Sequence, residues 1–396
     1  ELETLKTETL QRYQGLLRDN EASLTELSDS LQRRLEAWAH PNVRLGIEWQ
    51  SDPSKSVVLQ LPIAGIRTGE GDFLGSLARM GHGLQRSYLL ALLQELADSE
   101  ADDAPTLILG CEEPELYQHP PQARHLAEVL RELATGNNQI LVTTHSPLFV
   151  SGDGFENVRL VRRSGANGST TVRSLTFSNL CACIWDATGK DPERPTEGLV
   201  AKIHQALQPG IAEMFFTNVA VLVEGLEDVA YITTELHLAG LWTEFRRLGC
   251  HIIPVNGKDR LIQPLAIAVV TEMPVFVMFD ADSGTERQDH REKHERDNRA
   301  LQTLLKANPD PFPAADVFGP SYVIWRTSLT QVVREEFGDA YDRLTEAARQ
   351  HYAQEGGLEK NELFIADWIS AARDEGLSSP ALTRLCEAII EFAKTK

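Results

Sequence analysis

The chain has 396 residues, of which 42% are hydrophobic and 24% charged, and its formal net charge is −20. This length predicts roughly two or three domains rather than one. The charge argues against non-specific nucleic-acid binding by the whole surface, although a local basic track remains compatible with it. The sequence contains no apolar run of about 18 residues or more, so we expect no membrane span.

The five cysteines are scattered, and Cys181-Ala182-Cys183 has no partner at zinc-ligand spacing. We therefore expect free cysteines in a reducing, cytoplasmic environment. The chain starts with Glu1 and has no signal-peptide pattern, so we expect a fragment or a processed product.

Apolar residues recur at helical spacing from Leu2 to Trp38, and the intervals between Leu24 and Trp38 match a coiled-coil seam. No proline interrupts this pattern before Pro41. Residues 1–40 are therefore predicted to form a helical, coiled-coil arm, with an ordinary core helix as the alternative.

After the arm, the spacing of apolar residues changes from a helical to an alternating pattern, and glycines follow. Alternating apolar and polar residues over 42–67 predict short antiparallel strands. Gly81, Gly83 and Gln85 then lie at the start of an apolar helix. Glycines before a helix can present backbone N–H groups to a phosphate, although most such segments are only turns.

Acids and a histidine follow the next two predicted strands. Glu112 and Glu113 come after the strand predicted at residues 106–110, and His145 follows the one at 139–144. These are the groups needed around the γ-phosphate of a magnesium nucleotide, where one acid holds the ion, the other polarises water and the histidine senses the phosphate.

Taken in order, G-H-G-L-Q-R, L-I-L-G-C-E-E-P and T-T-H-S-P resemble the signature, Walker B and H-loop segments of an ABC-type ATPase of the AAA/SMC-like branch. The resemblance implies that Glu112 holds Mg²⁺ through water, Glu113 is the catalytic base and His145 the switch histidine. It also implies that the signature residues contact the nucleotide of a partner subunit; they are Gly81, Gly83 and Gln85.

The same resemblance is incomplete, because no G-x-x-x-x-G-K-[ST] Walker A motif occurs in these residues. In ABC folds this motif lies upstream of the arm. We therefore expect the chain to begin inside an ATPase whose N-terminal part is missing. ATP would bind only in the intact parent protein, and ATP hydrolysis by this chain would be absent.

Residues 157–176 are predicted to form a hairpin, residues 178–198 an irregular surface connection, and residues 199–216 a helix. A domain boundary is placed near residue 215. The predicted organisation is thus an arm at 1–40, a partial ABC-type ATPase at 41–215 and a further domain at 216–396.

The further domain opens with the apolar run Val219–Val223, which ends in Glu224 and Gly225. Such a run predicts a strand buried on both faces. Its carboxyl end is where open α/β sheets place their ligands. Asp228 follows at the start of a predicted helix, so both acids can face one site.

A second apolar strand, residues 275–279, ends in Asp280-Ala281-Asp282. Alternating strands and helices between the two acidic segments predict a parallel sheet with covered faces. Both strands would then deliver their acids to one sheet edge. Oxygen ligands of this kind suit Mg²⁺ and Mn²⁺.

The segments V-L-V-E-G-x-x-D, Gly257-Lys258 in a turn and D-A-D resemble the Toprim fold, a Rossmann-like parallel sheet with C-terminal helices at 216–396 in this chain. A partial ABC-type ATPase followed by Toprim resembles the C-terminal region of the OLD (overcoming lysogenization defect) family nucleases. This resemblance implies a Mg²⁺- or Mn²⁺-dependent DNA endonuclease that uses two ions. Its catalytic and metal-binding acids would be Glu224, Asp228, Asp280 and Asp282.

Other site residues stay open at this point. Ser283 or Thr285 could touch a metal. The family uses a glutamate on a helix after D-x-D, for which Glu335 and Glu336 are candidates although Thr330 aligns best. It also uses a lysine near the C-terminus, for which the candidate is Lys360, and an ordinary helix-flanking lysine is the alternative. Basic side chains in 285–299 are mostly a solvated helical face that could touch the DNA backbone; they are Arg291, Lys293, His294, Arg296 and Arg299.

Several alternatives compete with a nuclease. A glutamate at a strand end is often only a cap, and D-x-D arises by chance in acidic chains, although their joint placement on two apolar strands favours a site. An SMC- or RecF-like DNA-binding protein with a vestigial Toprim would bind DNA without cleaving it. A primase- or topoisomerase-like Toprim and a non-enzymatic scaffold remain further alternatives. We expect a homodimer, through either the ATPase lobes or the arm.

Overall fold

The computed structural model describes residues 2–38, 45–47, 67–68, 75–97, 108–135, 138–152, 154–163, 168–189, 197–353, 357–358 and 360–396. The chain divides into two compact units, Glu1–Gln85 and Arg86–Lys396. Most of the strands predicted over 42–67 lies outside the described residues.

The first unit contains two successive helices, α1 (Leu2–Asp19) and α2 (Glu21–Trp38). Asn20 separates them, and its side-chain amide donates to the carbonyl of Leu16. The helical prediction for this segment is confirmed. Leu27 and Leu31, on the predicted seam, are exposed, and pairing of the arm as a coiled coil stays a prediction.

The segment before residue 85 ends in a small hairpin and the start of a helix. Its elements are β1 (Arg67–Thr68), β2 (Gly75–Ser76), the 3-10 turn η1 (Leu77–Arg79) and the first turn of α4 (His82–Ala97). The Gln85 side-chain amide donates to the carbonyls of Leu77 and Met80. Gln85 thereby ties the start of α4 to the preceding turn.

In the second unit, strands β3 (Ile108–Glu112) and β4 (Gln139–Thr143) pair in parallel. Helix α5 (Pro120–Leu133) covers one face of this pair through its apolar side. The register sets Glu112 opposite Thr143. The acids at the end of β3 and the histidine after β4 therefore lie at the same end of the sheet.

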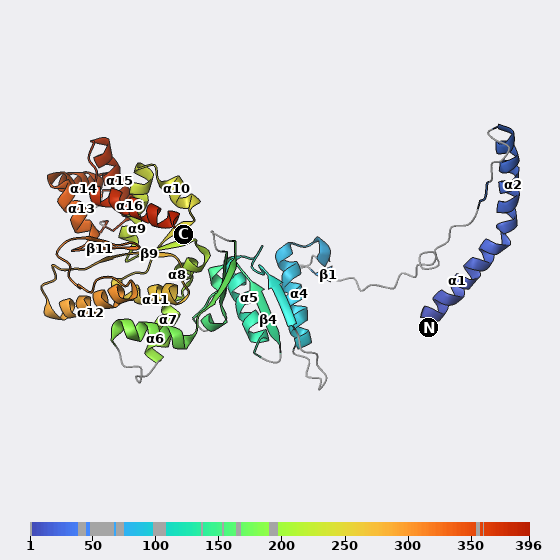
Figure 1. The fold of residues 1–396 in the computed structure, drawn as a ribbon, viewed down its shortest axis with the longest axis horizontal. Coiled ribbons are helices and arrows are strands. Elements are labelled where there is room, and N and C mark those ends of the chain that lie inside the picture. The colour runs from blue at the N-terminus through green and yellow to red at the C-terminus, as the bar shows by residue number, and fades with distance from the viewer. Residues whose placement is uncertain are drawn as a thin grey trace. The chain divides into compact units, whose positions relative to one another are not determined.

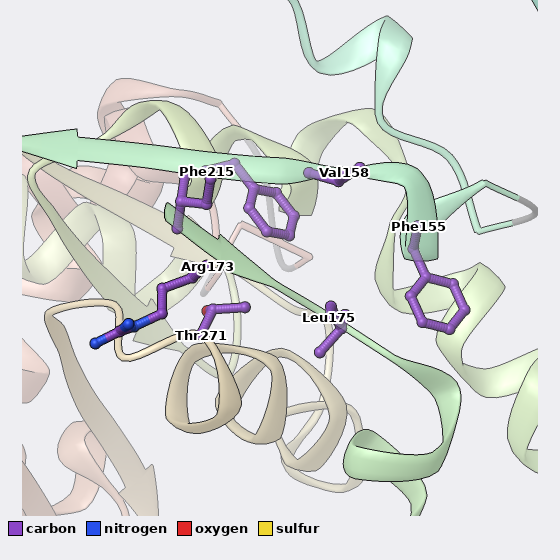
Figure 2. Close-up of a pocket in the computed structure, with 7 residues that line it drawn as sticks. Phe155, Val158, Arg173, Leu175, Phe215 and Thr271 are labelled. Carbon is purple, nitrogen blue, oxygen red and sulfur yellow. The ribbon is translucent and has the colours of Figure 1, made fainter. Parts of the chain in front are cut away.

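The predicted hairpin is confirmed as the antiparallel pair β5 (Arg159–Arg163) and β6 (Thr170–Ser174). Two short 3-10 turns precede it, η2 (Pro147–Phe149) and η3 (Phe155–Asn157). Figure 2 shows a small, mostly apolar cavity beside the hairpin, where Phe155, Leu175 and Phe215 converge. None of the predicted metal ligands lines it, so it is a packing gap rather than the site.

The prediction of an irregular connection over 178–198 is wrong for its first half, because α6 (Phe177–Thr188) is a helix. The Thr176 side chain accepts the N–H of Asn179 and begins the helix, and Gly189, at φ 62°, ends it. Leu180 and Ile184 are buried. Both prolines and most of the charges that favoured an irregular connection come only after Gly189, and residues 190–196 lie outside the described part.

Residues 199–216, predicted as one helix, belong to three pieces. They are α7 (Glu197–Ala206), α8 (Pro209–Ala212) and the 3-10 turn η4 (Glu213–Phe216). Pro209 sits at the first position of α8, where its missing N–H costs nothing but where it stops the preceding helix.

A five-stranded sheet in the order β10-β11-β9-β7-β8 forms the centre of the second unit. Four strands are parallel and β10 is antiparallel to β11. Their bounds are β7 (Val219–Val223), β8 (Cys250–Pro254), β9 (Val275–Asp280), β10 (Val317–Phe318) and β11 (Tyr322–Trp325). Every residue of β7 is buried, which confirms the strand predicted from its apolar run.

Helices cover both faces of this sheet (Figure 1). One face packs against α6, α11 (Ile262–Val270) and α12 (Gln288–Leu304). The other packs against the remaining helices: α9 (Leu226–Leu238), α10 (Trp242–Arg247), α13 (Leu329–Phe337), α14 (Asp339–His351), α15 (Glu362–Asp374) and α16 (Pro380–Lys394).

The hydrophobic core continues across the predicted boundary near residue 215. Leu160 of β5 and Leu180 of α6 belong to the same buried cluster as Leu222 of β7 and Val277 of β9. Residues from the hairpin onward therefore help to form one face of the sheet domain. Among the described helices, none has both the length and the apolar character that crossing a bilayer needs.

Candidate metal centre

The carboxyl ends of β7 and β9 lie side by side at a switch point of the sheet. The chain leaves β7 through α9, which packs on one face, and leaves β9 toward α12, which packs on the other. Open α/β sheets form a crevice where neighbouring strands send their helices to opposite faces. The predicted acids occupy this position.

Glu224 and Asp280 connect the two strand ends directly. The backbone N–H of Asp280 donates to Glu224 Oε1 at 2.9 Å. The Asp280 carboxylate in turn accepts the N–H of Leu329, at the start of α13, at 3.1 Å. Each side chain is thus fixed by backbone from a different element, which confines both carboxylates to the sheet edge.

Asp228 faces the same edge from the first turn of α9. Its Oδ2 accepts the N–H of Gly225 at 3.0 Å, and the side chain is 8% exposed. A carboxylate at this place satisfies a backbone donor that the helix leaves unpaired and suits the positive end of the helix dipole. Helix capping therefore contributes to its position.

Asp282 is held from two directions. Its Oδ2 accepts a hydrogen bond from Lys258 Nζ at 2.6 Å and lies 3.1 Å from His294 Nδ1. The residue has φ 53°, a left-handed conformation that costs a non-glycine residue energy. This turn directs the second aspartate of D-A-D back toward Lys258.

Crowding of the acids perturbs their protonation. Burial raises the pKa of Glu224 to about 7, and the positive charge of Lys258 opposes this rise. Burial likewise raises the pKa of Asp228 to about 7. The pKa of Asp280 is raised well above its usual range, by burial first and then by neighbouring carboxylates, of which Glu224 contributes most. Such a group of partly desolvated like charges favours an added cation.

The chemistry of these donors fits Mg²⁺ or Mn²⁺, which prefer carboxylate oxygens. Over the described residues, however, no three Asp, Glu, His or Cys side chains already stand where they could hold one ion together. An oxygen of each of the four carboxylates is engaged by an internal hydrogen bond or ion pair. Ion binding would therefore require these side chains to exchange internal contacts for metal–oxygen contacts.

Two residues of α12 support the D-A-D turn. Asn298 is fully buried and its amide donates to the carbonyl of Ala281 at 2.9 Å. Arg291 donates to the carbonyl of Ser283 at 3.0 Å while its guanidinium stacks over the ring of Phe312. Ser283, a predicted metal ligand, thus lies in a turn whose backbone is fixed on both sides.

The predicted helical glutamates have their described contacts elsewhere. Glu336 accepts the N–H of Ala381 and the hydroxyl of Ser379, so it binds the start of α16. Glu335 accepts from Gln331 on its own helix. The structure does not bring either glutamate to the four carboxylates, and Glu336 acts as a helix cap.

Lys360, by contrast, lies at the edge of the centre. Its Nζ is 3.7 Å from Glu227 Oε2, and its charge acts to lower the pKa of Asp228 against the larger effect of burial. Glu227 also accepts the hydroxyl of Thr330, on α13. Thr330, the position that aligns best with the family's glutamate, therefore donates a hydrogen bond to the first turn of α9 and supplies no carboxylate.

The roles of Glu227 and Lys258 could not be assigned from the sequence alone. Glu227 lies between Glu224 and Asp228 in E-G-L-E-D. Its position in the first turn of the predicted helix, next to Asp228, was the signal that could have identified it. Lys258 appeared only as part of the G-K turn. His294, one of the side chains that could touch the DNA backbone, lies 3.1 Å from Asp282 through its Nδ1.

Most of the other basic side chains of this segment are paired with acids. Lys293 lies 3.4 Å from Asp259, and Arg299 pairs with Glu295 on the same helix. Arg296 pairs with the neighbouring Asp297. These contacts fit the prediction of a mostly solvated helical face.

The ATPase-like residues form a separate group at the end of β3 and β4. His145 Nε2 lies 3.5 Å from Glu113 Oε1, as expected if both acted on one phosphate. Glu115 accepts the Thr144 hydroxyl and the His145 N–H and so fixes the histidine backbone. Glu112 is the exposed last residue of β3.

The fold and site define a chain with an ATPase-type segment followed by a Toprim domain that carries a carboxylate centre. Residues 2–150 match the family model of an AAA ATPase domain, and residues 215–282 match the model of the TOPRIM domain of overcoming lysogenization defect protein-like proteins. The second match includes all four acids, Glu224, Asp228, Asp280 and Asp282.

The relatives found are OLD nucleases. The Old nuclease of Escherichia phage P2 is 26% identical over 220 residues, 52% of this chain and 33% of that protein. The OLD nuclease of Thermus scotoductus is 26% identical over 228 residues, 56% of this chain and 40% of that protein. The matched region thus spans well under half of either relative. The predicted resemblance to OLD proteins is confirmed.

Solved structures that match include C-terminal regions of OLD proteins. That of Xanthomonas campestris pv. campestris is 14% identical, with a TM-score of 0.32, over 46% of this chain and 96% of that one. That of Burkholderia pseudomallei is 17% identical, with a TM-score of 0.26, over 45% and 86%.

Proposed function

We propose that this chain is a divalent-metal-dependent DNA endonuclease whose active centre lies at the carboxyl ends of β7 and β9. The observation that carries the proposal is the joint placement of Glu224, Asp228, Asp280 and Asp282 at a sheet switch point, where three of them have raised pKa values. The OLD-type TOPRIM match over residues 215–282 supports the same reaction class.

The four carboxylates would hold Mg²⁺ or Mn²⁺. Bound ions would supply Lewis-acid stabilisation of the charge that develops on the attacking and leaving oxygens of a phosphodiester. The chain's own contribution is positional, because Glu224 and Asp280 are each fixed by a backbone N–H. The two-ion arrangement stays a prediction, and so does a role for Ser283 as a ligand.

Lys360 is the candidate for neutralising charge on the scissile phosphate. Its side chain is 84% exposed and reaches the edge of the centre beside Glu227. An exposed ammonium at such an edge can meet a polyanion without first losing a buried partner. This position supports the catalytic role implied by the resemblance.

We also propose that Glu112, Glu113 and His145 belong to a nucleotide site of a homodimer. The close approach of Glu113 and His145 supports this. The remaining residues of that site would be Gly81, Gly83 and Gln85 from a partner subunit. Nucleotide contact would then be a property of the assembled parent protein, and cleavage a property of the carboxylate centre.

Nicking of supercoiled plasmid in the presence of Mn²⁺ tests the nuclease proposal. Asp280→Asn should reduce the rate by about 100-fold or more, because it removes a carboxylate that would hold the ion, and the ion would stabilise the negative charge of the transition state. Asp289→Asn is the matched control, since Asp289 is an exposed acid on α12 that pairs with Arg287. Full cleavage by Asp280→Asn would refute the assignment, and binding of DNA by the wild type without cleavage would favour the SMC- or RecF-like alternative.

A further inference from the structure

Lys258 is a buried cation inside the carboxylate centre. Its side chain is 6% exposed, and Nζ donates at 2.6 Å both to the carbonyl of Asp280 and to Oδ2 of Asp282. The ammonium therefore bridges the two aspartates of D-A-D, one through its backbone and the other through its carboxylate.

The turn after β8 is built to deliver this side chain. Asn256 has φ 62° and Gly257 has φ 131°, a conformation that essentially only glycine adopts. The N–H of Gly257 donates to the carbonyl of Glu224 at 2.8 Å, which ties the turn to the end of β7. Lys258 then begins the 3-10 turn η5 (Lys258–Arg260) with its side chain directed into the centre.

Burying an ammonium is unfavourable unless charged or polar partners replace water. The acids of the centre supply that replacement. Lys258 also acts on Glu224, where its charge opposes the effect of burial. One lysine thus interacts with acids delivered by both β7 and β9.

A lysine and a divalent ion would both bind Asp282 through the negative charge of its carboxylate. The ammonium already engages Oδ2, the oxygen that His294 also contacts. An ion held by the same carboxylate would experience the positive charge of Lys258 at short range, where little water screens it. The two cations therefore oppose each other.

We propose that Lys258 is a resident cation of the carboxylate centre, which positions Asp282 and competes with divalent ions for that carboxylate. Lys258 thereby weakens ion binding and offsets the repulsion among the acids before an ion arrives. This inference rests on the proposed metal-dependent function. A lysine that merely helped to organise the metal ligands would have the opposite effect on ion affinity.

The test is a titration of the full chain with Mn²⁺ in the absence of DNA, in which the free Mn²⁺ is measured by its electron paramagnetic resonance signal. Lys258→Met removes the charge and keeps much of the side-chain volume, and it should bind Mn²⁺ about tenfold more tightly or better. Lys258→Arg retains the charge and should stay near the wild type. Unchanged or weaker binding by Lys258→Met would overturn the inference.

A second readout guards against misfolding of the methionine variant. Lys258→Gln keeps a donor for the Asp280 carbonyl but carries no charge, and it should also bind Mn²⁺ more tightly. In either uncharged variant, Mn²⁺ should raise the unfolding temperature more than it does in the wild type, because at a given concentration a ligand that binds the folded state more tightly stabilises it more. A smaller or equal rise would contradict competition.

Asp280→Asn distinguishes failure of the proposed metal centre from failure of the role proposed for Lys258. If wild type and Asp280→Asn bind Mn²⁺ equally, the proposed metal centre fails. If Asp280→Asn abolishes binding while the uncharged Lys258 variants equal the wild type, the centre stands and only the role of Lys258 fails.

Discussion

A buried ion pair ties the C-terminal helices to the helix that starts at the carboxylate centre. Glu235 on α9 is 1% exposed and accepts hydrogen bonds of 2.9 and 2.8 Å from Arg373 on α15, and one of 2.8 Å from Thr383 on α16. Arg373→Met would leave this carboxylate buried without its counter-charge. Breaking a buried pair in this way costs about 3–5 kcal/mol. Because Arg373 is 34% exposed, we expect the lower end, about 3 kcal/mol.

Urea denaturation followed by circular dichroism measures this loss. The control is Arg343→Met, because Arg343 pairs with Glu375 and both side chains are exposed, so this substitution should cost far less stability than Arg373→Met. Combining Glu235→Leu with Arg373→Met should recover much of the stability, since no unpaired charge remains. If Arg373→Met costs no more than the control, the reasoning that links α9 to the C-terminal helices is refuted.

Two further predictions concern the centre itself. In metal-free protein the pKa of Glu224 is raised from 4.5, and that of Asp228 from 3.8, each to about 7. The folded chain therefore keeps protons that the unfolded chain has released, so their contribution to stability is present at low pH and is lost as pH rises toward 7. Urea denaturation with a chelator, from about pH 5 to about pH 8, should show a decline that is smaller in Glu224→Gln; equal slopes would contradict it. Gly257→Ala should lower the free energy of unfolding by about 1–3 kcal/mol, because alanine is strained at the φ of 131°. The control, Gly198→Ala in α7, should be neutral or stabilising. Equal urea midpoints for the two variants would argue against a strained turn.

Much of the sheet domain could be predicted because its strands are buried on both faces. The apolar run of β7 and the one of β9 each specify a strand by hydrophobicity alone, and the acids at their ends mark the functional edge. Helix α6 was missed because its apolar positions are followed closely by proline and charge. The composition of that downstream segment is therefore a poor guide to the structure of the residues just before it.

The side-chain partners could not be predicted in the same way. Nothing near Lys258 in the sequence indicates burial, because its partners come from a strand more than twenty residues later. The contacts of Glu336 equally depend on a distant element, because its carboxylate accepts the hydroxyl of Ser379 at the start of α16. Such contacts depend on how distant elements cross, which hydrophobic periodicity does not encode.

The position of the proposed nuclease centre follows from strand pairing more than from the acids themselves. The register of β7 with β9 sets Leu222 beside Val277. This register brings the Asp280 N–H to Glu224. Since a shift by one residue would reverse which face each side chain meets, the two buried faces of the sheet fix this register strongly. The same packing that makes β7 fully buried therefore holds the acids close together, where burial raises the pKa of Glu224 and Asp228 and the ammonium of Lys258 offsets part of the negative charge.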